Sequence, residues 1–490
     1  MKMNGLVLLA MLSVAACKAE PPTPEQPRPA LDKPAADDVR QDTTGAPTLA
    51  EVRSAALGQF VNLLEGKSAP ADTVFASYVV TWADADTARG AIWAAWREAN
   101  ARLGESKVLP LAPLDVAAPG LWAVPDSLER NAVMRYYYGT RGVSAEGRPL
   151  PLFVYLHGSG APDSEWAAGR RLALRLFGSE PSAYFVPRIP NTGDLYRWWQ
   201  RGKQWAWEKL LRQVLAGGDV DPLRIYFIGI SEGGYGSQRL ASFYADYLAG
   251  AGPMAGGEPL INAPVENCAN TAFSLLTGER DDGFCRNTLT RNTGLAFGEA
   301  QKEHAALAAD GELLFRHRVE LVPGAGHGID YSLTTPWLRQ HGRNPRPKVV
   351  LWEDFAMDGR RRGGFHNLWV VCPPTLPDAG SDRRTLYKMV VRGNAVEVSV
   401  DNVSYAVAEK DPRWGIGLRY DRSLAPASGG RLRIFLDERL VDVRRDVTVT
   451  VNGREAFRGR LVPTVADMVE SAAAYFDPGR VFAASVVVDY

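Results

Sequence analysis

The sequence predicts an α/β fold, with a doubly wound and mostly parallel sheet followed by a C-terminal all-β domain. Between about residues 132 and 345, short apolar runs alternate with segments of helical periodicity, a pattern typical of parallel βαβ units. Past about residue 345, short alternating segments recur with turn residues between them. Asn452-Gly453 follows one of these segments and is a strong hairpin signal.

The individual elements follow from these patterns. Strands of the first region are predicted at 133–138, 152–156, 183–187, 224–228, 272–276 and 318–322, with helices at 204–215 and about 234–247. Strands of the second region are predicted at 388–391, 395–400, 431–436 and 447–451. Functional residues are expected at the carboxyl ends of the parallel strands.

Length and charge limit the possible organisation. A chain of 490 residues predicts two or three domains, and 46% hydrophobic residues support a large core. Lys+Arg and Asp+Glu balance at 56 each, so nothing indicates a nucleic-acid partner. The predicted parts are a signal peptide and lipobox (1–17), a disordered linker (18–48), a helical cap segment (49–130), the α/β domain (131–345) and a β-sandwich-like domain (346–490).

The N-terminus has the features of a bacterial lipoprotein signal. A short basic start precedes an apolar run from Leu6 to Ala16, and Val14-Ala15-Ala16-Cys17 has the small-residue spacing of a lipobox. Cys17 would then carry the lipid, and the protein would be exported as an outer-membrane or periplasmic lipoprotein. An ordinary secretory signal or a start-site artefact is the alternative. The Pro- and Ala-rich linker that follows cannot bury a core.

Export would make the remaining cysteines candidates for disulfides. Three remain, Cys268, Cys285 and Cys372, so at least one must stay free or pair outside the chain. Cys268 and Cys285 flank a predicted strand, and a bridge between them requires the intervening loop to fold back. The sequence leaves that bridge open.

The most informative motif is Gly229-Ile230-Ser231-Glu232-Gly233, directly after the strand at 224–228. A buried strand that turns into a helix through Gly-x-Ser-x-Gly raises the serine hydroxyl above a parallel sheet, on a turn with no room for side chains at either glycine. Ser231 is therefore the predicted nucleophile.

A serine nucleophile needs a base and an orienting carboxylate. His327 lies in the glycine-rich loop Pro323-Gly324-Ala325-Gly326-His327-Gly328 after the last predicted strand of the α/β region, and it is the predicted base. Asp281 follows the strand at 272–276 and is the predicted acid. Asp282 is the alternative acid, and whichever of the two is not catalytic would cap the turn.

Backbone N–H donors are needed to stabilise a tetrahedral intermediate. The residue after the nucleophile, Glu232, would supply one donor. The loop His157-Gly158-Ser159-Gly160, after an earlier strand, would supply the other from Ser159, with Gly158 as the neighbouring candidate. His157 is expected to brace this loop rather than transfer protons.

These pieces occur in the chain order Ser, Asp, His. From about Ala132 to Trp337, the chain resembles α/β-hydrolases of the esterase and polyhydroxybutyrate-depolymerase-like group, which includes feruloyl and acetylxylan esterases and bacterial acyl-peptidases. The resemblance implies Ser231 as nucleophile, Asp281 as acid and His327 as base, with no cofactor. Glu232 departs from the small or apolar residue common after the nucleophile. The helical segment and the β domain, about half of the chain, lie outside the resemblance.

The resemblance and the motifs favour a carboxylic-ester hydrolase that acts through an acyl-enzyme on a small-molecule or polysaccharide ester. A serine peptidase of the same fold would have the same triad, and a non-catalytic surface protein that retains the fold is the third possibility. No residues have the spacing of zinc ligands, so no metal is expected.

A Trp-rich segment between residues 196 and 207 lies between the predicted third strand and its helix. Trp198, Trp199 and Arg197 could form a substrate-binding platform for a sugar ring, an aromatic acyl group or a carboxylate. The alternative is that the tryptophans pack this loop against the sheet.

Overall fold

A computed structural model describes residues 48–490, apart from 68–74, 76–77, 106–107, 145–146, 179, 191–196, 309–311 and 376–383. The predicted signal peptide, Cys17 and almost all of the predicted linker lie outside these residues. Within the described ranges, no helix combines the length and the apolar character needed to cross a membrane.

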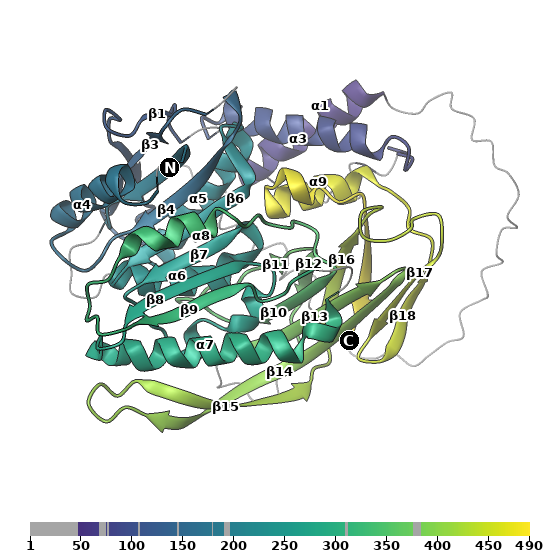
Figure 1. The fold of residues 1–490 in the computed structure, drawn as a ribbon. Helices are drawn as coiled ribbons and strands as arrows, with labels where there is room; N and C mark the ends of the chain where they lie inside the picture. The colour runs from purple at the N-terminus through teal and green to yellow at the C-terminus, as the bar shows by residue number, and fades with distance from the viewer. Residues whose placement is uncertain are drawn as a thin grey trace, which may run out of the picture.

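The α/β region is built on a nine-stranded, mostly parallel sheet (Figure 1). Its strands run in the order β1 (Ala112–Pro113), β3 (Val133–Arg141), β5 (Ser182–Pro187), β4 (Leu150–Leu156), β6 (Val220–Ile230), β7 (Gly250–Met254), β8 (Ala272–Gly278) and β9 (His317–Val322), and β2 (Gly120–Ala123) pairs with β3. All pairs from β5 to β9 are parallel, whereas β3 is antiparallel to β5 and to β2. This strand order is that of the α/β-hydrolase fold, and the predicted fold class is confirmed.

Helices cover both faces of the sheet, as a doubly wound fold requires. Along β4, Leu152 and Val154 enter the core on one face, while Phe153 and Tyr155 enter the core on the other. The first face is covered by α5 (Arg201–Gly217) and α6 (Glu232–Tyr244), and the second by α4 (Pro162–Arg175) and α8 (Thr334–Leu338). Helix α7 (Arg286–Glu303) packs on β8 through Phe297.

The central strand β7 is not recognisable in the sequence. Its residues, Gly-Ala-Gly-Pro-Met, have little β-propensity, yet all five are buried between β6 and β8. Its glycines are explained by close packing. A Cβ on Gly252 would lie 2.4 Å from Thr334 Cγ2, and one on Gly250 would lie 2.8 Å from Leu338 Cδ2, so α8 can approach only a bare backbone.

Two further sheets form the C-terminal region. The six-stranded sheet contains β10 (Val349–Asp354), β13 (Arg384–Arg392), β14 (Ala395–Lys410), β17 (Val447–Val451) and β18 (Arg454–Gly459), with β15 (Gly417–Pro426) paired to β14. The four-stranded sheet contains β11 (Gly364–Phe365), β12 (Leu368–Cys372), β16 (Arg431–Leu436) and β19 (Ala484–Asp489). One apolar core includes side chains of both sheets.

Two features of this region bear on the sequence predictions. Asn452 and Gly453 have φ values of 49° and 77° and join β17 to β18, as their hairpin signal predicts. The region also contains a helix, α9 (Val465–Tyr475), so the expectation of an all-β domain is wrong at this point. The alternating pattern of the neighbouring strands gave no indication of it.

The N-terminal helices α1 (Leu49–Leu64) and α3 (Ala85–Arg102) lie within the range 49–130 predicted as a helical cap, but they pack on α9. Phe60, Trp96 and Val469 belong to one buried cluster made by these three helices. The helices therefore join the C-terminal region instead of covering the α/β sheet as a cap. The rest of the range predicted as cap contributes β1 and β2 to that sheet.

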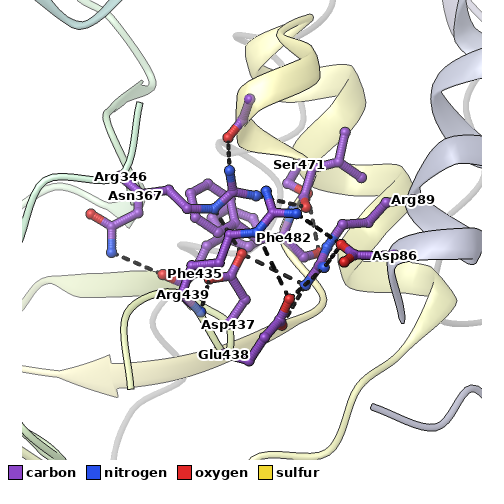
Figure 2. Close-up of polar contacts among 12 residues, drawn as sticks. Asp86, Arg89, Arg346, Asn367, Phe435, Asp437, Glu438, Arg439, Ser471 and Phe482 are labelled. Carbon is purple, nitrogen blue, oxygen red and sulfur yellow. Dashed lines mark hydrogen bonds and ion pairs between the residues drawn. The ribbon is translucent and has the colours of Figure 1, made fainter. Parts of the chain in front are cut away.

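An ion network links these parts of the chain (Figure 2). Arg89 of α3 donates from both terminal nitrogens to the two Glu438 carboxylate oxygens, each at 2.6 Å. Arg346, just before β10, donates from Nε to the buried Asp437 carboxylate at 2.8 Å. These ion pairs hold α3, the segment before β10 and the segment after β16 together.

Candidate active site

Ser231 occupies a strained turn between β6 and α6. Its φ of 58° and ψ of −114° lie in a region that non-glycine residues rarely adopt. A Cβ on Gly229 would come within 2.1 Å of the Gly233 carbonyl oxygen, and one on Gly233 within 1.9 Å of the Leu156 carbonyl oxygen. Close backbone contacts therefore leave no room for a side chain at either glycine of the motif.

Ser231, His327 and Asp281 form one hydrogen-bonded row. His327 Nε2 lies 3.0 Å from Ser231 Oγ, and His327 Nδ1 lies 2.7 Å from Asp281 Oδ2. A carboxylate beside Nδ1 favours the tautomer with its proton there, which leaves the Nε2 lone pair free to accept the serine proton. The geometry is that required for general-base activation of a hydroxyl.

The loops that carry the acid and the base are bound to each other through their backbones. The N–H of Glu279 donates to the Val322 carbonyl at 3.0 Å, and that of Arg280 donates to the Ala325 carbonyl at 2.9 Å. A Cβ on Gly278 would lie 1.9 Å from the Gly326 carbonyl oxygen. This close approach sets the acid and the base at a fixed separation.

Of the two adjacent aspartates, Asp281 is the one that the structure brings to His327. Its side chain is 4% exposed, and its second oxygen accepts a hydrogen bond from Arg286 Nη1 at 2.9 Å. Asp282 is exposed, and its carbonyl accepts the Cys285 N–H at 2.9 Å in the following turn. Arg286 was not predicted from the sequence, because an arginine at the start of a helix carries no signal of its partner.

The predicted oxyanion donors lie around Ser231. A Cβ on Gly158 would be 3.5 Å from Ser231 Cβ, so this loop passes directly beside the serine. Ser159, next in the loop, is exposed. Glu232 is the first residue of α6, where a backbone N–H has no acceptor within the helix. The positive end of the helix dipole therefore also points toward Ser231.

His157 braces the loop, as expected from the sequence. Its Nδ1 lies 2.7 Å from the Gly158 carbonyl oxygen, and its Nε2 accepts the Ile189 N–H at 3.1 Å. Burial lowers the pKa of His157 to about 4, so the ring is neutral and Nδ1 carries the proton. Trp198 adds a further support, since its indole N–H donates to the His157 carbonyl at 2.9 Å.

The Glu232 side chain lies in a buried, charged setting. Burial raises the pKa of its carboxyl to about 7, assisted by nearby Glu258 and opposed by Arg197, Arg239 and Arg286. Arg239 donates to Glu258 at 2.7 Å, whereas Arg197 Nε is 3.6 Å from Glu232 Oε1. Glu258 and Arg239 were not predicted, since neither belongs to a motif.

The predicted substrate platform is corrected at Trp198. This residue is fully buried, with its ring 4.9 Å from that of His157, so it cannot stack on a ligand. Trp199 is partly buried and lies under the Arg239 guanidinium, whose carbon is 3.9 Å from the ring centroid. The packing alternative therefore holds for Trp198. Arg197 remains partly exposed beside Glu232.

Cys268 and Cys285 are both free thiols, so the bridge that the sequence left open is absent between them. Among the described residues, no group of three or more His, Cys, Asp or Glu side chains is arranged to hold a metal ion.

No family model matches the chain. A curated poly(3-hydroxyalkanoate) depolymerase C from Paucimonas lemoignei is 28% identical over 118 residues, which are 22% of this chain and 28% of that protein.

Solved structures of similar fold include a thermostable esterase (TM-score 0.35, 21% identity, 47% of this chain and 64% of that one). A poly(3-hydroxybutyrate) depolymerase from Bordetella parapertussis also matches (TM-score 0.31, 15% identity, 44% of this chain and 86% of that one). A further match is the feruloyl esterase module from Clostridium thermocellum (TM-score 0.29, 15% identity, 44% of this chain and 84% of that one).

The chain thus resembles esterases and polyhydroxyalkanoate depolymerases. It spans less than two thirds of the depolymerase from Paucimonas lemoignei and of the thermostable esterase.

Proposed function

We propose that this protein is a serine hydrolase that cleaves a carboxylic ester through an acyl-enzyme. The observation that carries the proposal is the hydrogen-bonded row of Ser231, His327 and Asp281 at distances of 3.0 and 2.7 Å. The strained backbone at Ser231 supports it, because such strain persists where the surrounding structure holds a reactive group in place.

The proposed reaction runs in two halves. His327 Nε2 accepts the Ser231 proton as Oγ attacks the ester carbonyl, and the imidazolium that forms is stabilised by Asp281. The backbone N–H groups of Glu232 and Ser159 donate to the developing oxyanion, with Gly158 as the neighbouring donor. His327 returns the proton to the departing alcohol. Water, activated by the same histidine, then releases the acid and restores Ser231.

A carboxylic ester is proposed over a peptide bond because the curated relative and the solved structures named above are depolymerases of polyesters or esterases. A polysaccharide that carries acyl groups is one proposed substrate. The serine peptidase alternative has no observation of its own in the structure and is kept as an outcome of the test.

The test compares an ester and an amide that share an acyl group. The wild type is expected to hydrolyse p-nitrophenyl acetate and to leave acetyl p-nitroanilide intact, and Ser231→Ala is expected to lose the activity by a factor of about 10⁴ or more while folding normally. Hydrolysis of peptide anilides in preference to esters would favour the peptidase. A folded wild type inactive on every ester and amide would contradict the enzyme proposal.

Export and lipid attachment at Cys17 are also proposed, on the lipobox sequence alone. Metabolic labelling with a palmitate analogue in a bacterial host would test this. Label in the wild type and its loss in Cys17→Ser are expected, and an unlabelled membrane-free wild type would contradict the proposal.

A further inference from the structure

An exposed aromatic pair lies beside the loop between β8 and α7, residues 279–285, which carries Asp281 and is called the acid loop below. Phe284, from that loop, and Trp414, from the tip of the β14–β15 hairpin, have ring centroids 4.3 Å apart and an interplanar angle of 37°. Phe284 is 47% exposed and Trp414 is 37% exposed. Since large aromatic residues are usually buried for stability, a pair that keeps this much ring surface in solvent calls for another explanation.

The acid loop is strained in a way that turns Phe284 outward. Phe284 and Cys285 have φ values of 53° and 60°, two successive non-glycine residues in the left-handed region. Such a conformation is unfavourable for each of them and is retained where a site depends on it. Cys285 is buried while Phe284 is exposed, so the strained turn gives its apolar ring to solvent.

Trp414 is held just as firmly from the other side. Asp411 Oδ1 accepts the backbone N–H of Trp414 at 2.7 Å and that of Arg413 at 3.0 Å, which closes the tip of the hairpin. Asn292 of α7 donates to the Leu418 carbonyl at 2.9 Å, which ties the hairpin to the α/β region. In Figure 1, β14 and β15 extend past the other strands of their sheet and run beside α7.

Arg286 connects the aromatic pair to the triad. Its guanidinium donates to Asp281 and lies 5.2 Å from the Phe284 ring centroid. The same guanidinium is 5.7 Å from the ring of Tyr235, whose backbone N–H donates to the Ser231 carbonyl at 3.1 Å. The pair is therefore connected to the Ser231 turn through Arg286 and Tyr235, and to the triad through Arg286 and Asp281.

We infer that Phe284 and Trp414 form a subsite that stacks on a flat ring of the substrate. The inference rests on the proposed ester hydrolysis and gives the C-terminal region a direct part in substrate recognition. Offset or tilted stacking on exposed aromatic surface favours planar rings. The Arg286 guanidinium lies over the Phe284 ring and that of Arg413 over the Trp414 ring, at 5.2 and 4.6 Å from the centroids. The surface that the two rings still expose is the proposed contact for the substrate ring. The ring is either aryl or pyranose, since both present a flat apolar face.

The test compares variants on esters with and without a ring. Trp414→Ala and Phe284→Ala are measured against ethyl acetate, ethyl benzoate and an acetylated methyl glucoside. For whichever ring substrate uses the subsite, each variant is expected to raise KM about threefold to tenfold more than it raises KM for ethyl acetate, with little change in the ratio of the kcat values. Trp414→Phe, which retains a ring, is expected to keep most of the affinity.

Leu424→Ala is the matched control, because Leu424 is 51% exposed on β15 of the same hairpin. Its kinetics should equal those of the wild type on all three esters. A higher KM for a ring ester in Trp414→Ala, with no change in this control, supports the subsite. The ring ester whose KM rises identifies the substrate class.

Two results are distinguishable failures. A wild type inactive on all three esters contradicts the proposed function itself. The subsite is overturned if the wild type is active on a ring ester and the kinetics of Trp414→Ala and Phe284→Ala equal those of the wild type. It is also overturned if both variants lose affinity equally for all three esters. In either case ester hydrolysis stands. Near-ultraviolet circular dichroism of each variant confirms that the hairpin is folded.

Discussion

Arg286 Nη1 lies 2.9 Å from Asp281 Oδ1, the carboxylate oxygen that His327 does not contact. The carboxylate is thus held from two sides, by an imidazole on one oxygen and a guanidinium on the other. Because a buried carboxylate with one donor has more freedom to rotate, Arg286 is expected to act as a positioning residue for the acid.

Removing Arg286 should therefore slow the chemical step. We expect Arg286→Ala to lower kcat on ethyl acetate about tenfold with little change in KM, since the loss concerns the orientation of His327 and not substrate binding. Arg286→Lys should recover part of the rate. Arg280→Ala, an exposed arginine on the same loop, is the control. Equal rates for Arg286→Ala and Arg280→Ala would contradict the positioning role.

The glycines of the serine turn give a second prediction. Gly229→Ala should lower kcat/KM at least about 100-fold, because its Cβ would overlap the Gly233 carbonyl oxygen at 2.1 Å and displace Ser231. Gly298→Ala in α7 is the matched control, since no atom lies within 4 Å of its added Cβ. Full activity of Gly229→Ala would show that the turn tolerates a side chain.

Glu232 gives a prediction about pH. Burial raises the pKa of its carboxyl from 4.5 to about 7, so the folded protein favours the neutral form. The native state then binds more protons than the unfolded state between these values, and the stability that this group contributes falls as pH rises from about 4.5 through 7. Between pH 5 and pH 8 the loss should be about 2–3 kcal/mol.

Urea unfolding at pH 5 and pH 8 would measure this effect. Glu232→Gln cannot ionise, so its free energy of unfolding should decline less than that of the wild type over the same interval. The difference between the two declines isolates Glu232 from other titrating groups. Parallel declines in the two proteins would mean that the carboxyl is already ionised at pH 5.

The ion network in Figure 2 gives a prediction about stability. Asp437 is fully buried and accepts from Arg346 at 2.8 Å, with Arg89 Nη2 at 3.7 Å. Asp437→Asn should lower the free energy of unfolding by about 3 kcal/mol, because a buried arginine loses its counter-charge. Asp489→Asn, which removes an exposed pair with Arg431, should cost less than about 1 kcal/mol. Equal losses in the two variants would contradict this account.

The sequence predicted those parts of the fold in which local pattern and tertiary packing agree. Strand β4 and residues 225–229 of β6 are continuous apolar runs because both of their faces are buried. Gly229 and Gly233 are visible because their close contacts admit no other residue. Strand β7 escaped detection since packing against α8 demands glycine, which removes the strand signal.

The site was predictable to a similar extent. Ser231 and His327 lie in glycine-rich turns with a recognisable spacing from their strands, whereas the choice of Asp281 over Asp282 depends on which carboxylate the loop turns inward. Arg286 lies five residues after Asp281 and Phe284 three, but neither belongs to a motif. Trp414 is 130 residues distant from Phe284 in the chain and lies beside it because α7 and the β14–β15 hairpin pack together. Contacts of that range leave no local pattern.

The central claim is that Ser231 is the nucleophile. Reaction of the folded protein with a fluorophosphonate, followed by tryptic digestion and mass spectrometry, tests it most directly. One adduct on the peptide 225–239, absent in Ser231→Ala and slowed at least 100-fold in His327→Ala, is the expected result. No adduct on folded wild type, or equal labelling of Ser231→Ala, would contradict the claim.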